Sequence, residues 1–166
     1  MQGSRALNGA MREFDPRCVP QPRSEVLFPD VAGPIDLEIG CGAGYHPILY
    51  AKREPERTLV AIERTQTRFA RFEGRLVGHP ELTNIVPVNA DAVRWVTHRV
   101  PEQAVERIFL LYPNPYPKKG QANKRWHFMP FMGRLLGALA SGGSLALSTN
   151  MEFYAEEAEH LSLIHI

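Results

Sequence analysis

The sequence is poor in cysteine and has no long apolar segment. Only two of its 166 residues are cysteines, Cys18 and Cys41, which is too few for a disulfide framework and is typical of a reducing compartment. No segment approaches the roughly 18 apolar residues that a membrane helix needs, and no basic region followed by an apolar core marks a secretory signal. We therefore expect a cytoplasmic protein without a membrane span.

Acidic residues are absent from one long part of the chain. The net charge is +1, so the overall balance does not point to a partner. Between positions 107 and 151, however, there is no Asp or Glu, while the segment holds six basic residues: Arg107, Lys118, Lys119, Lys124, Arg125 and Arg134. Such a run predicts a positive surface that attracts polyanions.

The chain is long enough for one domain. Residues 1–33 contain several prolines and no periodicity, which predicts an irregular arm before a domain at 34–166. Within that domain, apolar runs predict strands at 35–39, 58–62, 84–88, 107–112 and 144–149. Helical spacing predicts helices at 45–53, 65–77, 90–98, 124–140 and 151–160. Strands that alternate with helices predict an α/β fold of Rossmann-like type, with a mainly parallel sheet and helices on both faces.

The last six residues, 161–166, follow the fifth predicted strand and the final predicted helix. They fit a sixth strand, or the artificial end of a truncated reading frame. We favour truncation slightly, because the chain stops where more sheet is expected.

Three glycines, Gly40, Gly42 and Gly44, follow the first predicted strand. Glycine permits a tight turn and a close approach of the backbone to a ligand, and parallel sheets bind ligands at the carboxyl ends of their strands. By itself this spacing is a weak signal for a nucleotide site. Cys41 within the loop fits a small side chain in a crowded turn better than a nucleophile, since no partner base is evident.

Three acidic residues near strand ends make the signal more specific. Glu63 ends the second predicted strand and can accept hydrogen bonds from ribose hydroxyls. Glu38 precedes the glycines, where a carboxylate would repel a pyrophosphate but attract an ammonium or sulfonium group. Asp91 follows the third strand and can accept from an adenine amine. The set favours S-adenosylmethionine over NAD; the alternative is that Asp91 or Glu38 caps a neighbouring helix.

A stiff loop of alternating prolines, 112–119, follows the fourth predicted strand. Basic residues beside it can bind phosphates, and Tyr116 or Trp126 can stack on a base. No His or Cys cluster has the spacing of a metal site. We expect solvated or helix-surface positions for His46, His79, His98 and His127.

From about Leu27 to Glu157 the chain resembles the tRNA (guanine-N7)-methyltransferase family. That family combines a Glu-Ile-Gly-x-Gly-x-Gly strand with a downstream Pro-Asp-Pro-Trp-Pro-Lys-Lys loop and a basic cluster. The resemblance implies an S-adenosylmethionine-dependent enzyme that methylates N7 of a guanine in tRNA. It implies cofactor contacts from Glu38, Glu63, Asp91 and Asn114, the last also in the catalytic position, and substrate contacts from Lys118, Lys119 and Asn150.

The acceptor motifs depart from the family pattern. Asn114 and Asn150 stand where the family has Asp, Tyr116 stands where it has Trp, and a C-terminal Thr-x-x-Glu segment is missing. An amide loses the charge of a carboxylate and gains a donor, which weakens recognition of guanine N–H groups. Two alternatives therefore remain: a methyltransferase for a small-molecule or protein acceptor, and a non-catalytic cofactor- or RNA-binding paralogue.

Overall fold

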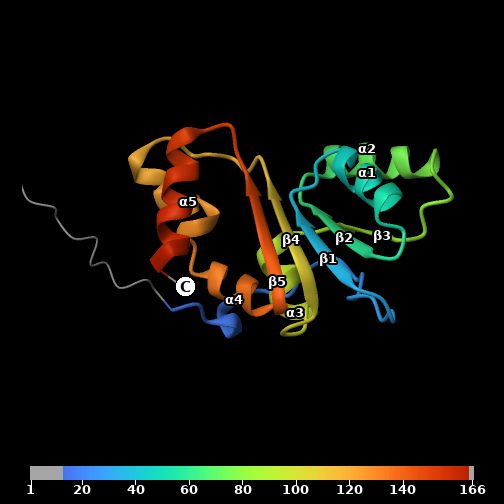
Figure 1. The fold of residues 1–166 in the computed structure, drawn as a ribbon, viewed down its shortest axis with the longest axis horizontal. Helices are drawn as coiled ribbons and strands as arrows, with labels where there is room; N and C mark the ends of the chain where they lie inside the picture. Colours follow the sequence, from blue (N-terminus) through green and yellow to red (C-terminus); the bar gives the residue numbers. More distant parts are fainter. Residues whose placement is uncertain (1–12, 165–166) are drawn as a thin grey trace, which may run out of the picture.

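The computed structural model describes residues 13–164 and contains a five-stranded sheet in the order β3-β2-β1-β4-β5 (Figure 1). Every neighbouring pair of strands is parallel. The strands are β1 Ile35–Ile39, β2 Thr58–Glu63, β3 Ile85–Asn89, β4 Val105–Leu111 and β5 Leu139–Ser148. The predicted Rossmann-like α/β class is confirmed.

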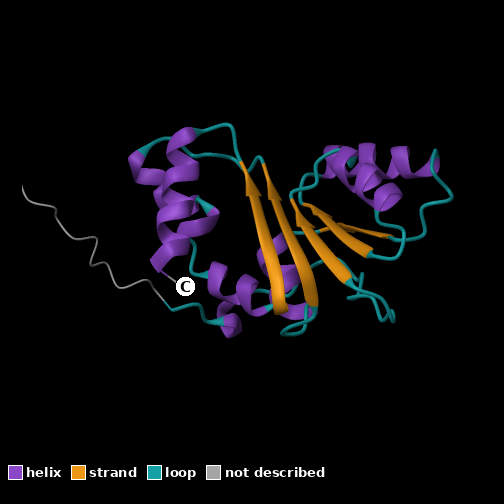
Figure 2. Ribbon diagram, in the orientation of Figure 1, coloured by secondary structure: helices purple, strands orange, loops and turns teal. Residues whose placement is uncertain are grey.

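Five α-helices and three short 3-10 helices connect and flank the strands in the described residues (Figure 2). The α-helices are α1 Tyr45–Arg53, α2 Gln66–Val77, α3 Ala92–Arg99, α4 Phe131–Gly137 and α5 Glu152–Ile164. The 3-10 helices are η1 Pro16–Cys18, η2 Lys119–Lys124 and η3 Trp126–Phe128.

The sheet has an apolar core on each face. Alternate strand residues point to opposite faces, so Val60 and Ile62 join one cluster with α3 and α4, while Ala61 joins the other. Phe69 and Phe72 of α2 fill this second cluster, and Figure 1 shows α1 and α2 together on one side of the strands. Strand order reverses between β1 and β4, which is where this type of sheet binds ligands.

A buried charged group fixes the start of β1 to the neighbouring elements. The Asp36 side chain is fully buried and accepts hydrogen bonds from Arg57 Nε and Nη2 at 2.6 and 2.5 Å and from the Tyr50 hydroxyl at 2.6 Å. A buried carboxylate is tolerated only when it is paired in this way. The network therefore holds α1 and the turn before β2 against β1, and the ligand-binding end of β1 is fixed with them.

Residues 13–34 contain only η1 as regular structure and lie along α3. Trp95 Nε1 donates to the carbonyl of Val26 at 2.9 Å, and a ring nitrogen of His98 lies 2.7 Å from the carbonyl of Val19. Phe14 and Phe28 pack against the larger core cluster. Residues 1–12 of the predicted arm lie outside the described residues.

The continuous helix predicted at 124–140 is wrong. Pro130 explains the break, because a proline disfavours helical backbone in the residue before it, and Met129 is extended with φ −74° and ψ 136°. A short helix, α4, follows, and β5 already begins at Leu139, five residues earlier than the predicted start at 144. Gly142 lies inside this strand at φ 79°, where the β4–β5 register is irregular.

The C-terminal segment is helical as far as the structure describes it. Helix α5 continues to Ile164, so a sixth strand over 161–164 is also wrong. Positions 165 and 166 lie outside the described residues.

Candidate active site

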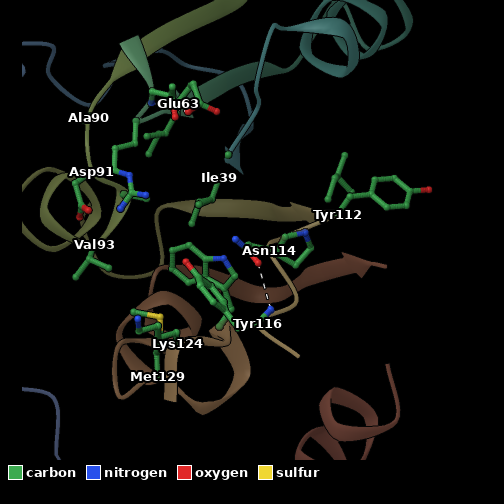
Figure 3. A pocket seen from close by; sticks show the side chains of 18 of the residues that line it. Ile39, Glu63, Ala90, Asp91, Val93, Tyr112, Asn114, Tyr116, Lys124 and Met129 are labelled. Atoms are coloured by element: carbon green, nitrogen blue, oxygen red, sulfur yellow. Dashed lines mark hydrogen bonds between the residues drawn. The ribbon is translucent and has the colours of Figure 1, made fainter. Parts of the chain in front are cut away.

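A pocket of about 600 Å³ opens at the carboxyl ends of the strands (Figure 3). Its volume is in the range of small-ligand and cofactor sites. Polar lining residues come from the ends of β2 and β3 and from the segment after β4: Glu63, Arg64, Thr65, Arg68, Asp91, Asn114, Asn123 and Lys124. The apolar part of the wall includes Ile39, Val93, Trp126 and Met129. The pocket thus collects residues from segments far apart in the sequence.

The glycine loop leads from β1 over the neighbouring strand. The backbone N–H groups of Gly40 and Cys41 donate to the carbonyl of Ile62 at 2.8 and 3.0 Å. Gly44 then begins α1 at φ 82°, and a Cβ there would overlap the buried ring of Phe72. Only glycine therefore permits α1 to approach α2 this closely, which is a packing requirement beyond the turn itself.

Glu63 is held in place by the loops around it. Its side chain is almost fully buried and accepts from the backbone N–H of Gly42 at 2.9 Å and of Thr65 at 2.6 Å. A carboxylate offers about four lone-pair sites, so it retains acceptor capacity for a ligand in the pocket that it lines.

The position of Asp91 is compatible with both roles that the sequence left open. It lines the pocket, and its Oδ1 accepts from the backbone N–H of Arg94 at 3.1 Å, which caps α3. One cap bond leaves Oδ2 and further lone pairs for a ligand. Capping and ligand contact are therefore compatible at this position.

Glu38 lies outside the pocket lining, unlike Gly40, Glu63, Asp91 and Asn114. It is 2% exposed, and its Oε2 lies 2.7 Å from Nδ1 of His46 on α1. Gly42 and Gly44 shape the loop but do not line the pocket either. The pairing with His46 gives this histidine a partner that the sequence did not indicate.

The loop after β4 forms one side of the pocket. Figure 3 shows Asn114 and Tyr116 on the other side of the pocket from Asp91, with the Tyr112 ring pointing away. Asn114 Oδ1 accepts from the backbone N–H of Tyr116 at 3.2 Å. Tyr112 and Tyr116 adopt φ values of 50° and 44°, and strained backbone of this kind concentrates at functional sites.

The remaining predicted substrate residues lie beyond the pocket. Lys118, Lys119 and Asn150 are exposed and do not line it. Lys124 does line it, and its Nζ lies 5.8 Å from the centre of the Tyr116 ring. The basic surface near the loop therefore consists of lysines.

Arg125, which the sequence placed with the phosphate-binding residues, is instead buried. Its Nη1 donates to both carboxylate oxygens of Glu157 on α5, at 2.5 and 2.6 Å, while Nε and Nη2 donate to the carbonyl of Tyr116. Only 5% of its side chain is exposed. Arg125 therefore ties the loop after β4 to α5 and is shielded from a polyanion.

His127 is likewise buried, so the expected surface position is wrong. Its Nε2 lies 3.0 Å from Oε2 of Glu157, and its ring packs at 84° to that of Tyr154. Burial lowers the pKa of His127 below its ordinary value of 6.5, and the hydrogen bond to Glu157 opposes this shift. His127 thus extends the contact between α5 and the segment after the loop.

Arg64, Arg68 and Met129 are pocket residues that the sequence analysis missed. Arg64 follows Glu63 directly, and Arg68 lies in the first turn of α2. The available signal in the sequence was that both arginines lie close to the end of β2. Met129 directly precedes Pro130, where the predicted helix over 124–140 is broken. A continuous helix over this segment did not predict that Met129 lines the pocket.

Cys41 is buried, and burial raises the pKa of its thiol, with a further contribution from Glu38 and Glu63. A thiolate is therefore disfavoured, which agrees with a small side chain packed in the turn. Within residues 13–164 no three His, Cys, Asp or Glu side chains are grouped as metal ligands. No helix of the described part of the chain is long and apolar enough to cross a membrane.

Two solved structures with a similar fold are named as methyltransferases. The precorrin-6y C5,15-methyltransferase of Geobacter metallireducens is 16% identical with a TM-score of 0.62, covering 80% of this chain and 63% of that one. An S-adenosylmethionine-dependent O-methyltransferase of Thermotoga maritima is 17% identical with a TM-score of 0.58, covering 78% and 43%. At these identities the likeness concerns the fold, which is that of Rossmann-like, S-adenosylmethionine-dependent methyltransferases.

Sequence comparison is more specific. A family model described as "Putative methyltransferase" matches residues 32–165. A tRNA (guanine-N(7)-)-methyltransferase of Paramagnetospirillum magneticum is 30% identical over 161 residues, 92% of this chain and 67% of the relative. That of Anaeromyxobacter dehalogenans is 33% identical over 131 residues, 79% and 65%. The chain belongs to this tRNA (guanine-N7)-methyltransferase family. It spans between 39% and 67% of the length of such relatives.

Proposed function

We propose that this chain transfers a methyl group from S-adenosylmethionine to N7 of a guanine in tRNA. The observation that carries the proposal is the shared pocket: Glu63 and Asp91, suited to the cofactor, face the loop that holds Asn114. Relatives that match most of this chain are named as tRNA (guanine-N(7)-)-methyltransferases. This arrangement supports a methyl donor and an acceptor base bound in one cavity.

The donor set fits the cofactor. Glu63 retains lone pairs toward the pocket and would accept from the ribose hydroxyls, and Asp91 would accept from the exocyclic amine of adenine. Glu38 would attract the cationic part of the ligand through its charge. Gly40 lines the pocket without a side chain and leaves room for the ligand. S-adenosylmethionine, when bound, supplies a methyl group on a positively charged sulfur.

The acceptor chemistry needs little from the protein besides placement. Guanine N7 carries a free lone pair, so the new N–C bond forms as the S–C bond breaks and no general base is required. Asn114 would help to orient the base, while Lys118, Lys119 and Asn150 would contact the RNA. The rate then depends mainly on alignment and on exclusion of water.

The direct test is a methylation assay with bulk tRNA and radiolabelled S-adenosylmethionine, followed by nucleoside analysis. The expected product is 7-methylguanosine. Label on a small molecule or protein but not on tRNA would replace tRNA as the acceptor. Cofactor binding without transfer to any acceptor would identify a non-catalytic paralogue and refute the proposal.

The cofactor site is tested separately with Glu63→Ala. A hydrogen bond to a charged group contributes about 1.5–3 kcal/mol, so the dissociation constant for S-adenosylmethionine should rise by roughly 10- to 150-fold. Glu73→Ala, an exposed acid on α2 outside the pocket, is the matched control. Unchanged affinity in the Glu63 variant would contradict the assigned ribose contact.

A further inference from the structure

Helix α2 carries a row of arginines that the methyl-transfer site does not explain. Arg64 precedes the helix, and Arg68, Arg71 and Arg75 follow at intervals of four, three and four residues. Because of this spacing, Arg68, Arg71 and Arg75 lie on one face of α2, and Arg64 stands just before the helix begins. We call this set the arginine row.

Neighbouring acidic residues do not neutralise the positive charge of the arginine row. Arg64, Arg68 and Arg71 are exposed, and none of them forms an ion pair with a residue in the range 13–164. Glu73 is the only acid of α2, and it lies two positions from both Arg71 and Arg75, a spacing that does not face either of them. Uncompensated like charges repel one another, so an anion bound along the row would be favourable.

One end of the row opens into the pocket. Arg64 and Arg68 line it together with Lys124, which comes from the segment after β4. Cations from separate elements therefore border the cavity in which a target base would react. A polyanion that delivers a base to the pocket would pass between them.

The other end of the row meets an exposed aromatic ring. The guanidinium carbon of Arg75 lies 3.7 Å from the centre of the Tyr45 ring, and Nη2 donates to the Tyr45 hydroxyl at 2.5 Å. Arg75 Nε also donates to the carbonyl of Ala43 at 2.9 Å, which fixes the stack beside the glycine loop. Tyr45 remains 66% exposed, and bases stack on rings of this kind.

We propose that the arginine row binds the phosphate backbone of the nucleic acid that flanks the target base, an inference that rests on the proposed function. The seven residues of helical rise from Arg68 to Arg75 correspond to about 10 Å, and a guanidinium pairs with phosphate oxygens through two parallel hydrogen bonds. A single narrow row fits one strand of backbone, and the ring of Tyr45 ends it with a surface for a base. Membrane binding is disfavoured because it usually pairs basic residues with an apolar face exposed to lipid, whereas Phe69 and Phe72 of α2 are buried.

The test compares three proteins that fold to the same thermal midpoint. One carries R64Q, R68Q and R71Q; a second carries R71Q alone, outside the pocket; the control carries R23Q, K52Q and R53Q, which removes the same charge from exposed positions elsewhere. Dissociation constants for tRNA are measured by fluorescence anisotropy across a series of salt concentrations. S-adenosylmethionine affinity is measured for each protein as well.

Each phosphate contact that is lost should lower the slope of log K against log salt by about one. We expect a decrease of about one for R71Q and about three for the triple variant, with tRNA affinity reduced more than tenfold at low salt. R71Q should bind S-adenosylmethionine like the wild type. Equal slopes for the triple variant and the control would overturn the inference. So would unchanged tRNA binding together with weaker binding to anionic phospholipid vesicles.

The methylation assay separates this inference from the proposed function. If the wild type methylates tRNA and the triple variant keeps its KM, the arginine row is refuted and the proposed function stands. If the wild type forms no 7-methylguanosine, the proposed function fails. The anisotropy slopes then still support or refute the row as a nucleic-acid surface.

Discussion

The close approach of α1 and α2 at Gly44 gives a quantitative prediction for the glycine loop. Both Gly42→Ala and Gly44→Ala place a side chain at positive φ, 61° and 82°, which costs about 1–2 kcal/mol. At Gly42 the new methyl meets no atom within 4 Å, whereas at Gly44 it overlaps the ring of Phe72, which is fully buried. Overpacking of a core adds about 1–3 kcal/mol, so the loss of stability should be about 2–5 kcal/mol for Gly44→Ala.

Equilibrium unfolding in urea measures the two losses directly, provided that the slope with denaturant is unchanged. The additional cost at Gly44 should disappear when Phe72 is shortened, because the three atoms nearest to the added Cβ all belong to that ring. In the Phe72→Ala background, Gly44→Ala should therefore cost no more than Gly42→Ala does in the wild type. Equal losses for the two glycine variants in the wild type, or full additivity in the double variant, would refute the packing argument.

Two further predictions concern the contacts of α5. Glu157→Gln leaves the buried Arg125 guanidinium without a charged partner. Since Glu157 is 31% exposed, the free energy of unfolding should fall by about 2–3 kcal/mol, below the usual range for a fully buried pair. Urea unfolding measures this loss, with Glu156→Gln at an exposed position as the control. Because burial lowers the pKa of His127, the unfolded chain takes up a proton first as the pH falls below about 6.5, so stability declines there. His127→Gln should remove this part of the pH dependence in melts from pH 7.5 to 5, and an unaltered profile would contradict it.

The parts of the fold set by local pattern were predictable. Strand β1, the glycine loop and α1 occupy the predicted positions because alternation, glycine spacing and helical periodicity all act over a few neighbouring residues. Since parallel strands end at a common edge, the same local signals brought Gly40, Glu63 and Asp91 to one pocket. The rest of that prediction came from the topology of parallel sheets, which bind ligands at the carboxyl ends of their strands.

Contacts between distant segments were not predictable in this way. In the sequence, Arg125 is one of several basic residues beside a loop. Its partner Glu157 is 32 positions away, so their pairing leaves no local signal. The break before α4 did have a local signal in Pro130, which the prediction of a continuous helix over 124–140 did not take into account. Burial of Arg125 thus leaves Lys118, Lys119 and Lys124 as the exposed basic residues of the segment 112–125.

The contacts of Asn114 indicate what changes at this position, where the family pattern has Asp. Asn114 Oδ1 accepts the backbone N–H of Tyr116, and a carboxylate oxygen would accept the same bond. The loop conformation therefore does not depend on the charge, and Arg125 stabilises it independently through the carbonyl of Tyr116. The exchange removes a negative charge from the pocket wall while the wall keeps its shape. Its consequence must therefore appear in the recognition or turnover of the acceptor base and not in the stability of the fold.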